Sequence, residues 1–185
     1  VVAEMPFGSY QDEKSALKNA AKFIKAGADA VKFEGGLKAA PIVKRLVGDG
    51  INVMAHIGLM PQFVRNEGGY KIKGRSEADE ARLIEEAQAL EHAGAFSAVL
   101  EGTVSSVAAK VAKSVKMPII GIGAGADVDG QVLVWSDMLG FFDEFKPKFV
   151  KRYLDGANLV RTAVEAYARE VREKTFPSEE FEYKI

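Results

Sequence analysis

Short apolar runs alternate with amphipathic segments along this chain, and four of the runs end on a residue that can do chemistry. They are Val1 to Glu4, Ala30 to Glu34, Ile51 to His56 and Phe96 to Glu101. Buried parallel strands read as apolar runs of about four to eight residues. In α/β proteins the carboxyl ends of such strands carry the reacting groups. The pattern therefore predicts strands that end at an active site.

The segments between these runs have helical spacing, with apolar positions three and four residues apart. We expect helices over residues 12–26, 37–47, 77–92, 104–115 and 159–174, and two more strands over Ile119–Ile122 and Val132–Trp135. Alternating strands and helices predict a parallel sheet with right-handed crossovers. Six strands fit a doubly wound sheet, and they also fit a (β/α)8 barrel without its first two units, because such barrels typically need about 250 residues.

Two features bear on domain organisation. The chain opens without Met inside an apolar run, so we expect further sequence to precede it. The connection from Ile57 to Ser76 is far longer than the usual loop of about 4 to 6 residues, which is typical of functional loops. We expect one N-terminally incomplete (β/α) barrel domain over residues 1–185, with C-terminal helices at about 146–174.

Composition narrows the class of partner. The chain has 185 residues, 48% of them hydrophobic, which suits one globular domain with a substantial core. Its net charge of −1 offers no excess of positive charge for nucleic acid, and no run approaches the roughly 20 apolar residues of a membrane helix. The absence of cysteine excludes disulfides and thiolate metal sites and is compatible with a cytoplasmic location.

Acidic strand ends suggest a site for a hard cation. Lys32 and Glu34 are two residues apart on one predicted strand and should share a face, where a structural salt bridge is the alternative to a catalytic role. Glu4 ends the preceding strand, and two carboxylates from neighbouring strand ends suit Mg²⁺, which completes its shell with water and substrate oxygens. Glu101 ends a later strand and is a candidate general base.

Two further features have both a structural and a functional interpretation. His56 ends an apolar run; a lone histidine there is commonly a hydrogen-bonded structural residue, and we keep it as a candidate for lining the substrate site. The run Gly121 to Gly125 follows a late strand, where barrels often bind phosphate, but it lacks the spacing of a dinucleotide fingerprint. A tight turn close to substrate is the alternative.

The chain also resembles the ketopantoate hydroxymethyltransferase family over essentially its whole length. The matching stretches are MPFGSY at Met5 to Tyr10, VKFEGG at Val31 to Gly36, VMAHIGLMPQ at Val53 to Gln62, GGYKIKGR at Gly68 to Arg75, IIGIGAG at Ile119 to Gly125, DGQVLVW at Asp129 to Trp135 and KFVKRY at Lys148 to Tyr153. The resemblance implies a (β/α)8 TIM barrel, with this chain covering strands three to eight.

The resemblance also implies roles for the strand-end residues. Glu34 matches a Mg²⁺ ligand of the family, and Glu4 stands where the family usually has a metal-binding Asp. Lys32 matches the lysine that contacts the keto acid, and Glu101 matches the general base. A further metal-binding Asp and a substrate-contacting Ser belong to the family's second strand, a segment that we expect outside this chain.

The implied reaction joins a small keto acid to a one-carbon unit. Mg²⁺ polarises the keto oxygen of 3-methyl-2-oxobutanoate, Glu101 removes the C3 proton, and the enolate attacks the carbon delivered by 5,10-methylenetetrahydrofolate, giving 2-dehydropantoate. Lys32 holds the substrate carboxylate or stabilises the enolate. Gln62 and Tyr70, in the long connection, are candidates for lining the folate pocket.

Partners and rival functions follow from the same resemblance. Family members are decamers, so we expect a homo-oligomer that acts on small molecules. One alternative is another Mg²⁺-dependent α-keto-acid barrel of the phosphoenolpyruvate mutase or isocitrate lyase type, although those typically use a cysteine-bearing loop and this chain has no cysteine. The other alternative is a non-catalytic truncated homologue.

Overall fold

The computed structural model describes residues 1–142 and 144–184, which form two compact units, Val1–Val132 and Leu133–Ile185. The first unit contains the sheet and every residue named above as a site candidate. No helix in the described ranges is both long enough and apolar enough to cross a membrane. That one barrel domain spans the whole chain stays a prediction.

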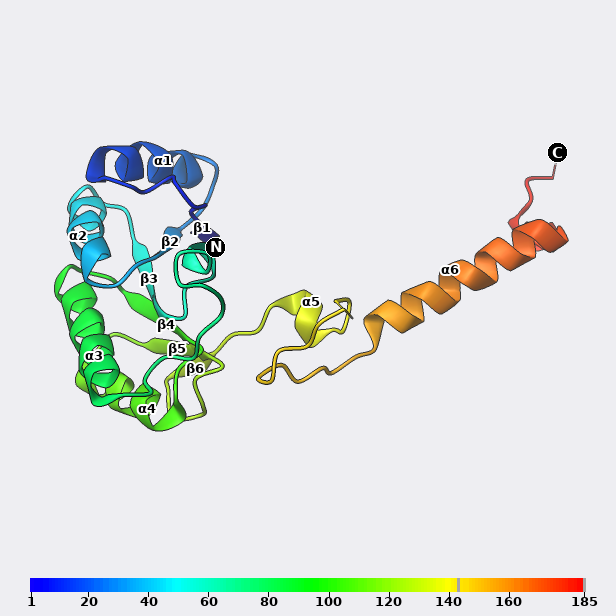
Figure 1. Ribbon diagram of the computed structural model, residues 1–185. Helices are drawn as coiled ribbons and strands as arrows, with labels where there is room; N and C mark the ends of the chain where they lie inside the picture. Colours follow the sequence, from blue (N-terminus) through cyan, green and yellow to red (C-terminus); the bar gives the residue numbers. More distant parts are fainter. Residues whose placement is uncertain (143, 185) are drawn as a thin grey trace. The chain divides into compact units, whose positions relative to one another are not determined.

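The first unit is built on one parallel sheet of six strands. The strands are β1 (Val2–Glu4), β2 (Ala30–Glu34), β3 (Val53–Gly58), β4 (Ser97–Glu101), β5 (Ile119–Ile122) and β6 (Gly130–Gln131). Each strand pairs with the next one along the chain, in the order β1-β2-β3-β4-β5-β6 (Figure 1). A doubly wound sheet reverses its order at a switch point, whereas this sheet does not. The sheet is a curled half-barrel, as expected for part of a (β/α) barrel.

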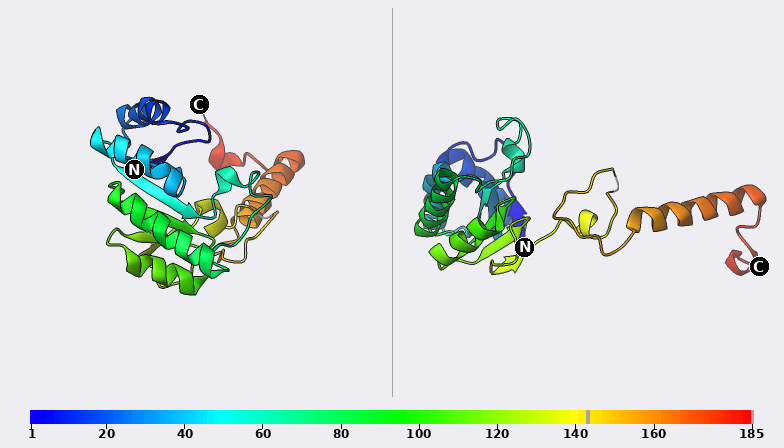
Figure 2. Two further views of the ribbon diagram at one scale, coloured as in Figure 1. Left: turned by 60° about the vertical axis from the view of Figure 1, so that its left-hand side comes forward. Right: turned by 60° about the horizontal axis from the view of Figure 1, so that its bottom comes forward.

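Helices follow the strands and cover one face of the sheet. The helical elements are α1 (Glu13–Lys25), η1 (Leu37–Ala39), α2 (Ala40–Gly48), η2 (Pro61–Phe63), α3 (Glu77–His92) and α4 (Ser105–Ser114). Because right-handed crossovers in a sequential sheet all return on the same side, α1 to α4 lie together on the outer face, as the ribbons show (Figures 1 and 2). The opposite face is left for the site.

Local sequence signals explain where these helices begin. Asp12 accepts a hydrogen bond from the backbone N–H of Ser15 at 2.8 Å, and the Ser15 hydroxyl accepts one from the backbone N–H of Asp12, which together form a capping box. Ser76 likewise accepts from the backbone N–H of Asp79 at 3.1 Å. These caps confirm the predicted starts of the helices over 12–26 and 77–92.

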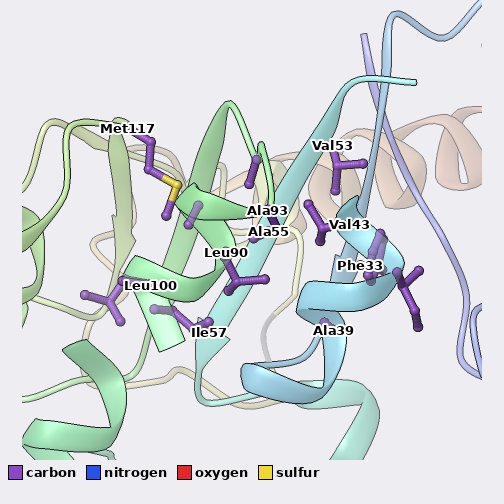
Figure 3. Packing of buried hydrophobic residues seen from close by; sticks show 14 of the residues in the cluster. Phe33, Ala39, Val43, Val53, Ala55, Ile57, Leu90, Ala93, Leu100 and Met117 are labelled. Atoms are coloured by element: carbon purple, nitrogen blue, oxygen red, sulfur yellow. The ribbon is translucent and has the colours of Figure 1, made fainter. Parts of the chain in front are cut away.

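The hydrophobic core lies between the outer face of the sheet and the helices. Alternate strand residues such as Phe33, Ile57 and Leu100 point into it, and Val43 of α2 and Leu90 of α3 meet them from the helices (Figure 3). All five are at most 1% exposed. Because strand side chains alternate, burying these residues places Lys32, His56 and Glu101 on the other face.

The structure corrects two predicted elements. The strand expected over Val132–Trp135 is instead Gly130–Gln131, and the following short helix α5 spans Trp135–Met138. Val132 adds one more ladder hydrogen bond, to the carbonyl of Gly121 at 3.0 Å, after which the chain leaves the sheet. The C-terminal helices expected at about 146–174 reduce to α6 (Gly156–Glu173), since residues 146–155 are not helical.

The second unit consists of α5, α6 and the short helix η3 (Glu179–Phe181). Aromatic rings meet near its end: the Tyr167 and Phe176 rings lie 5.4 Å apart, and the Phe176 and Phe181 rings 5.9 Å apart. The end of α6 is therefore tied to the tail that follows it. None of the predicted site residues belongs to this unit.

Candidate active site

Four neighbouring strands, β1 to β4, present the predicted site residues on one face of the sheet. In the register of β2 and β3, Glu34 lies opposite His56, and in the register of β3 and β4, Gly58 lies opposite Glu101. Gly58 has φ of 88°, and a Cβ there would lie 2.3 Å from the Glu101 carbonyl oxygen. Only glycine therefore lets β3 run this close to the residue that ends β4.

His56 lies at the centre of the site, in contact with residues of β2 and β4. It is 3% exposed; its Nδ1 lies 3.2 Å from Lys32 Nζ, and its Nε2 lies 3.0 Å from the Leu59 carbonyl oxygen and 3.3 Å from Glu101 Oε2. Because an ammonium can only donate and those two oxygens can only accept, the contacts require a proton on Nε2 and none on Nδ1. His56 is thus held as the neutral Nε2–H tautomer between a cation and a carboxylate.

Glu34 is the most buried acid at these strand ends, at 4% exposed. Its Oε2 accepts a hydrogen bond from the backbone N–H of Gln62 at 2.9 Å, and its Oε1 lies 4.0 Å from His56 Nδ1. Burial raises the pKa of Glu34, against the lowering effect of the Gln62 hydrogen bond and of the Lys32 charge. The negative charge of Glu4 raises that pKa further.

Glu4 and Lys32 lie at the more open edge of the site. Glu4 ends β1 opposite Lys32 in the strand register, its side chain is 43% exposed, and it forms an ion pair with Lys32 Nζ. Glu4 Oε1 also accepts a hydrogen bond from Gln62 Nε2 at 2.9 Å. Lys32 therefore contacts both Glu4 and His56, and it is the one cation in direct contact with the predicted set within the described ranges.

Gln62, on η2, organises this cluster in a way that its predicted role does not cover. Its backbone N–H donates to Glu34, its side-chain amide donates to Glu4 and to the Met5 carbonyl oxygen at 3.1 Å, and its Oε1 accepts from the Tyr10 hydroxyl at 2.7 Å. Burial and the nearby acids raise the pKa of Tyr10 to about 12, so this hydroxyl keeps its proton. The only signal in the sequence is that Gln62 follows a strand end closely.

Glu4 and Glu34 can supply two carboxylate ligands to a hard divalent cation, but not a complete set of protein ligands. The described residues contain no group of three or more acidic, histidine or cysteine side chains that could hold a metal. Glu4 and Glu34 come from neighbouring strand ends and are bridged by Gln62. Mg²⁺ commonly takes one or two protein carboxylates and completes its shell with water and substrate oxygens, so this donor set suits it.

A pocket of about 690 Å³ opens beside Glu34. The loops after β1, β2 and β3 and the helix α3 line it, with Phe7, Phe63, Arg82 and Glu86 among the side chains. Tyr70, predicted to line a folate pocket, does not line it, and its side chain is 72% exposed. In the glycine run after β5, a Cβ on Gly125 would lie 2.6 Å from Ser105 Cβ, so the backbone there passes close to the start of α4.

Comparison with solved structures supports the fold. A putative phosphonomutase from Burkholderia cenocepacia J2315 superposes with a TM-score of 0.53 at 15% sequence identity, covering 94% of this chain and 69% of that one. At this identity the likeness extends to the fold alone. It agrees with the half-barrel sheet and with strand ends that meet at a common mouth.

Comparison of sequences identifies the family of the chain. A protein of Campylobacter curvus named 3-methyl-2-oxobutanoate hydroxymethyltransferase is 65% identical over 185 residues, which is 100% of this chain and 69% of that protein. A protein of the same name from Aliarcobacter butzleri is 58% identical over 184 residues, with 99% and 68% covered. The family described as ketopantoate hydroxymethyltransferase matches residues 1–179. The chain therefore belongs to the ketopantoate hydroxymethyltransferase family.

Proposed function

We propose that the protein transfers a hydroxymethyl group to 3-methyl-2-oxobutanoate, giving 2-dehydropantoate, with 5,10-methylenetetrahydrofolate as the one-carbon donor. Family membership supports the reaction class. The single structural observation that carries the proposal is the buried His56, which links Lys32 on β2 to Glu101 on β4. A carboxylate, a cation and two metal-binding candidates at adjacent strand ends suit proton abstraction next to a keto group.

The fold supports a finer assignment of the strands. The six strands are sequential and parallel, and their carboxyl ends carry the site residues in the order expected for a barrel mouth. We assign β1 to β6 to strands three to eight of a (β/α)8 barrel. The cytoplasmic location and the decamer stay predictions.

Glu101 is the proposed general base. Its side chain is 16% exposed, and Oε2 lies 3.3 Å from His56 Nε2, whose hydrogen bond goes to the Leu59 carbonyl oxygen. Glu101 takes the C3 proton of the keto acid, and the electron pair of that bond becomes the enolate. The enolate carbon then forms a bond to the one-carbon unit, both bonds from that carbon to folate nitrogens break, and water supplies the hydroxyl group of the product. The C3 proton from Glu101 and the remaining proton of water pass to the two folate nitrogens, and tetrahydrofolate leaves.

Lys32 and the acids of β1 and β2 bind and orient the substrate. Lys32 Nζ is fixed between Glu4 and His56, where it can meet the carboxylate of the keto acid. Glu34 and Glu4 would hold Mg²⁺, which when bound supplies Lewis-acid polarisation of the keto group. Gln62 keeps these two carboxylates together through its two N–H donors.

Proton exchange at C3 tests the proposal without the folate. We expect the protein to replace the C3 proton of 3-methyl-2-oxobutanoate with deuterium when both are incubated with Mg²⁺ in deuterated buffer. Proton NMR measures the rate of this exchange. Glu101→Gln should slow exchange by about 100-fold or more, the usual contribution of a general base. Glu85→Gln, the same change at an exposed position of α3, should leave the rate unchanged.

The same experiment separates the alternatives. A non-catalytic homologue would show no exchange above the buffer rate. A barrel of the phosphoenolpyruvate mutase or isocitrate lyase type would not form 2-dehydropantoate when 5,10-methylenetetrahydrofolate is added. Exchange in Glu101→Gln at the rate of the unsubstituted protein would remove Glu101 as the base.

A further inference from the structure

The pocket beside Glu34 contains a buried carboxylate that the reaction chemistry above does not use. Glu86, on α3, is 8% exposed and lines the pocket. Its nearest cationic partner is Arg82, whose Nη1 lies 3.7 Å from Glu86 Oε1, and no hydrogen bond reaches the Glu86 carboxylate from any residue that the structure describes. Such an acid is costly to bury unless donors meet it.

The chain makes room for this carboxylate. Gly36, in the loop after β2, lies so close that a Cβ there would meet the Glu86 carboxyl carbon at 2.3 Å. Burial raises the pKa of Glu86, with Arg82 acting in the opposite direction. The Glu86 oxygens therefore lie against the bare backbone of Gly36, at the wall of the pocket.

The rest of the wall is apolar and aromatic. Phe7 and Phe63 meet edge to face, with ring centroids 5.6 Å apart, and Leu37 and Ile42 add aliphatic surface. The volume of about 690 Å³ lies within the range of roughly 300 to 1,000 Å³ typical of small-molecule sites. A flat ring could pack on these side chains while its polar edge meets Glu86.

We propose that this pocket binds the pteridine ring of the folate co-substrate, with Glu86 accepting hydrogen bonds from its adjacent N–H donors. The inference rests on the proposed function, which supplies a folate. A 2-amino-4-oxo pteridine carries an amino group beside a ring N–H, and a carboxylate accepts such a pair with both oxygens. Because Glu34 lines the same pocket, a ring held there lies beside the site of the keto acid.

The cations of the pocket suit the other end of a folate. Lys38 lines the pocket from η1, and Arg82 is exposed beside Glu86 on α3. Lys38 can pair with a carboxylate of the glutamate tail, whereas Arg82 already forms an ion pair with Asp79. Glu67 also lines the pocket, but its carboxylate already pairs with Lys73.

Binding of 5-formyltetrahydrofolate, followed by isothermal titration calorimetry, tests the pocket. Glu86→Gln should weaken binding by at least tenfold, and Phe7→Ala, an exposed change, should weaken it severalfold. Glu85→Gln, one residue away and outside the pocket, should bind as the unsubstituted protein does. p-Aminobenzoylglutamate lacks the pteridine, so Glu86→Gln should leave its affinity unchanged.

C3 proton exchange, measured without folate, separates this inference from the proposed function. Glu86→Gln should exchange at the unsubstituted rate, which shows that the fold and the keto-acid site are intact. The inference is overturned if Glu86→Gln binds 5-formyltetrahydrofolate normally, or if it loses p-aminobenzoylglutamate equally. Exchange without any folate binding by the unsubstituted protein overturns the pocket alone, whereas loss of both overturns the proposed function as well.

Discussion

The hydrogen bond between Tyr10 and Gln62 should contribute measurably to stability, because both groups leave water to make it. The Tyr10 hydroxyl donates to Gln62 Oε1 at 2.7 Å, and Tyr10 is 7% exposed. Gln62→Met keeps the approximate length of the side chain and removes the acceptor. It also leaves the backbone N–H that binds Glu34 in place, so the change isolates the amide.

The expected cost follows from the contacts that are lost. A buried hydroxyl without a partner costs about 1–3 kcal/mol. The bond to the Met5 carbonyl oxygen adds about 0.5–1.5 kcal/mol, and the exposed contact with Glu4 adds about 0–1 kcal/mol. We therefore expect Gln62→Met to lower the free energy of unfolding by about 1.5–5.5 kcal/mol.

A double-mutant cycle that combines Gln62→Met with Tyr10→Phe measures the interaction free energy between the two side chains. Tyr10→Phe alone should cost about 1–2 kcal/mol, and because the phenyl ring leaves no orphaned hydroxyl, the double variant should be little worse than Gln62→Met. The coupling energy from urea unfolding should be about 1–2 kcal/mol. Costs that add to within about 0.5 kcal/mol would refute the argument that these groups depend on each other.

Three other variants test the core, the strand crossing and the pocket acid. Leu90→Ala removes a fully buried side chain and should cost about 2–5 kcal/mol in urea unfolding. Gly58→Ala forces a Cβ against the Glu101 carbonyl oxygen at positive φ; it should cost at least about 1–3 kcal/mol and reduce C3 exchange, and normal values for both would contradict the crowding. Because the folded pKa of Glu86 is raised, its contribution to stability is complete below its ordinary pKa of about 4.3 and is lost as pH rises through the folded value. Glu86→Gln should therefore be more stable than the unsubstituted protein at pH 7 and lose the advantage toward pH 4, as thermal unfolding at several pH values would show.

The elements that the sequence predicts best are those with two agreeing signals. The helix over 77–92 has a Ser76 cap and a buried stripe, and the structure reproduces its bounds. Strands that end at Glu34 and Glu101 were marked by both apolar runs and polar ends. Val132–Trp135 had the apolar run alone, and in the structure Val134 and Trp135 are 51% and 64% exposed. A short apolar run without flanking support does not fix a strand.

The sequence identified the residues of the candidate site but not the contacts between them. Spacing placed Lys32 and Glu34 on one face, and the structure confirms that placement. The link from His56 to Glu101 depends on strand register, and the Gln62 bridge depends on how η2 folds back over β1 and β2. The burial of Glu86 could not be predicted for the same reason. In the sequence it is an ordinary charged residue of an amphipathic helix, and only the fold places Gly36 beside it. Local patterns carry no information about contacts between distant segments.

The sequential order of the sheet also has a consequence for how the protein is made. Each strand from β2 to β6 pairs with its immediate predecessor, so a strand leaving the ribosome finds its partner already synthesised. The sheet can grow unit by unit, and Lys32, His56 and Glu101 come together as soon as β2, β3 and β4 have paired. These three residues of the candidate site thus come from one continuous stretch of chain and can be assembled during translation, before the C-terminal unit exists.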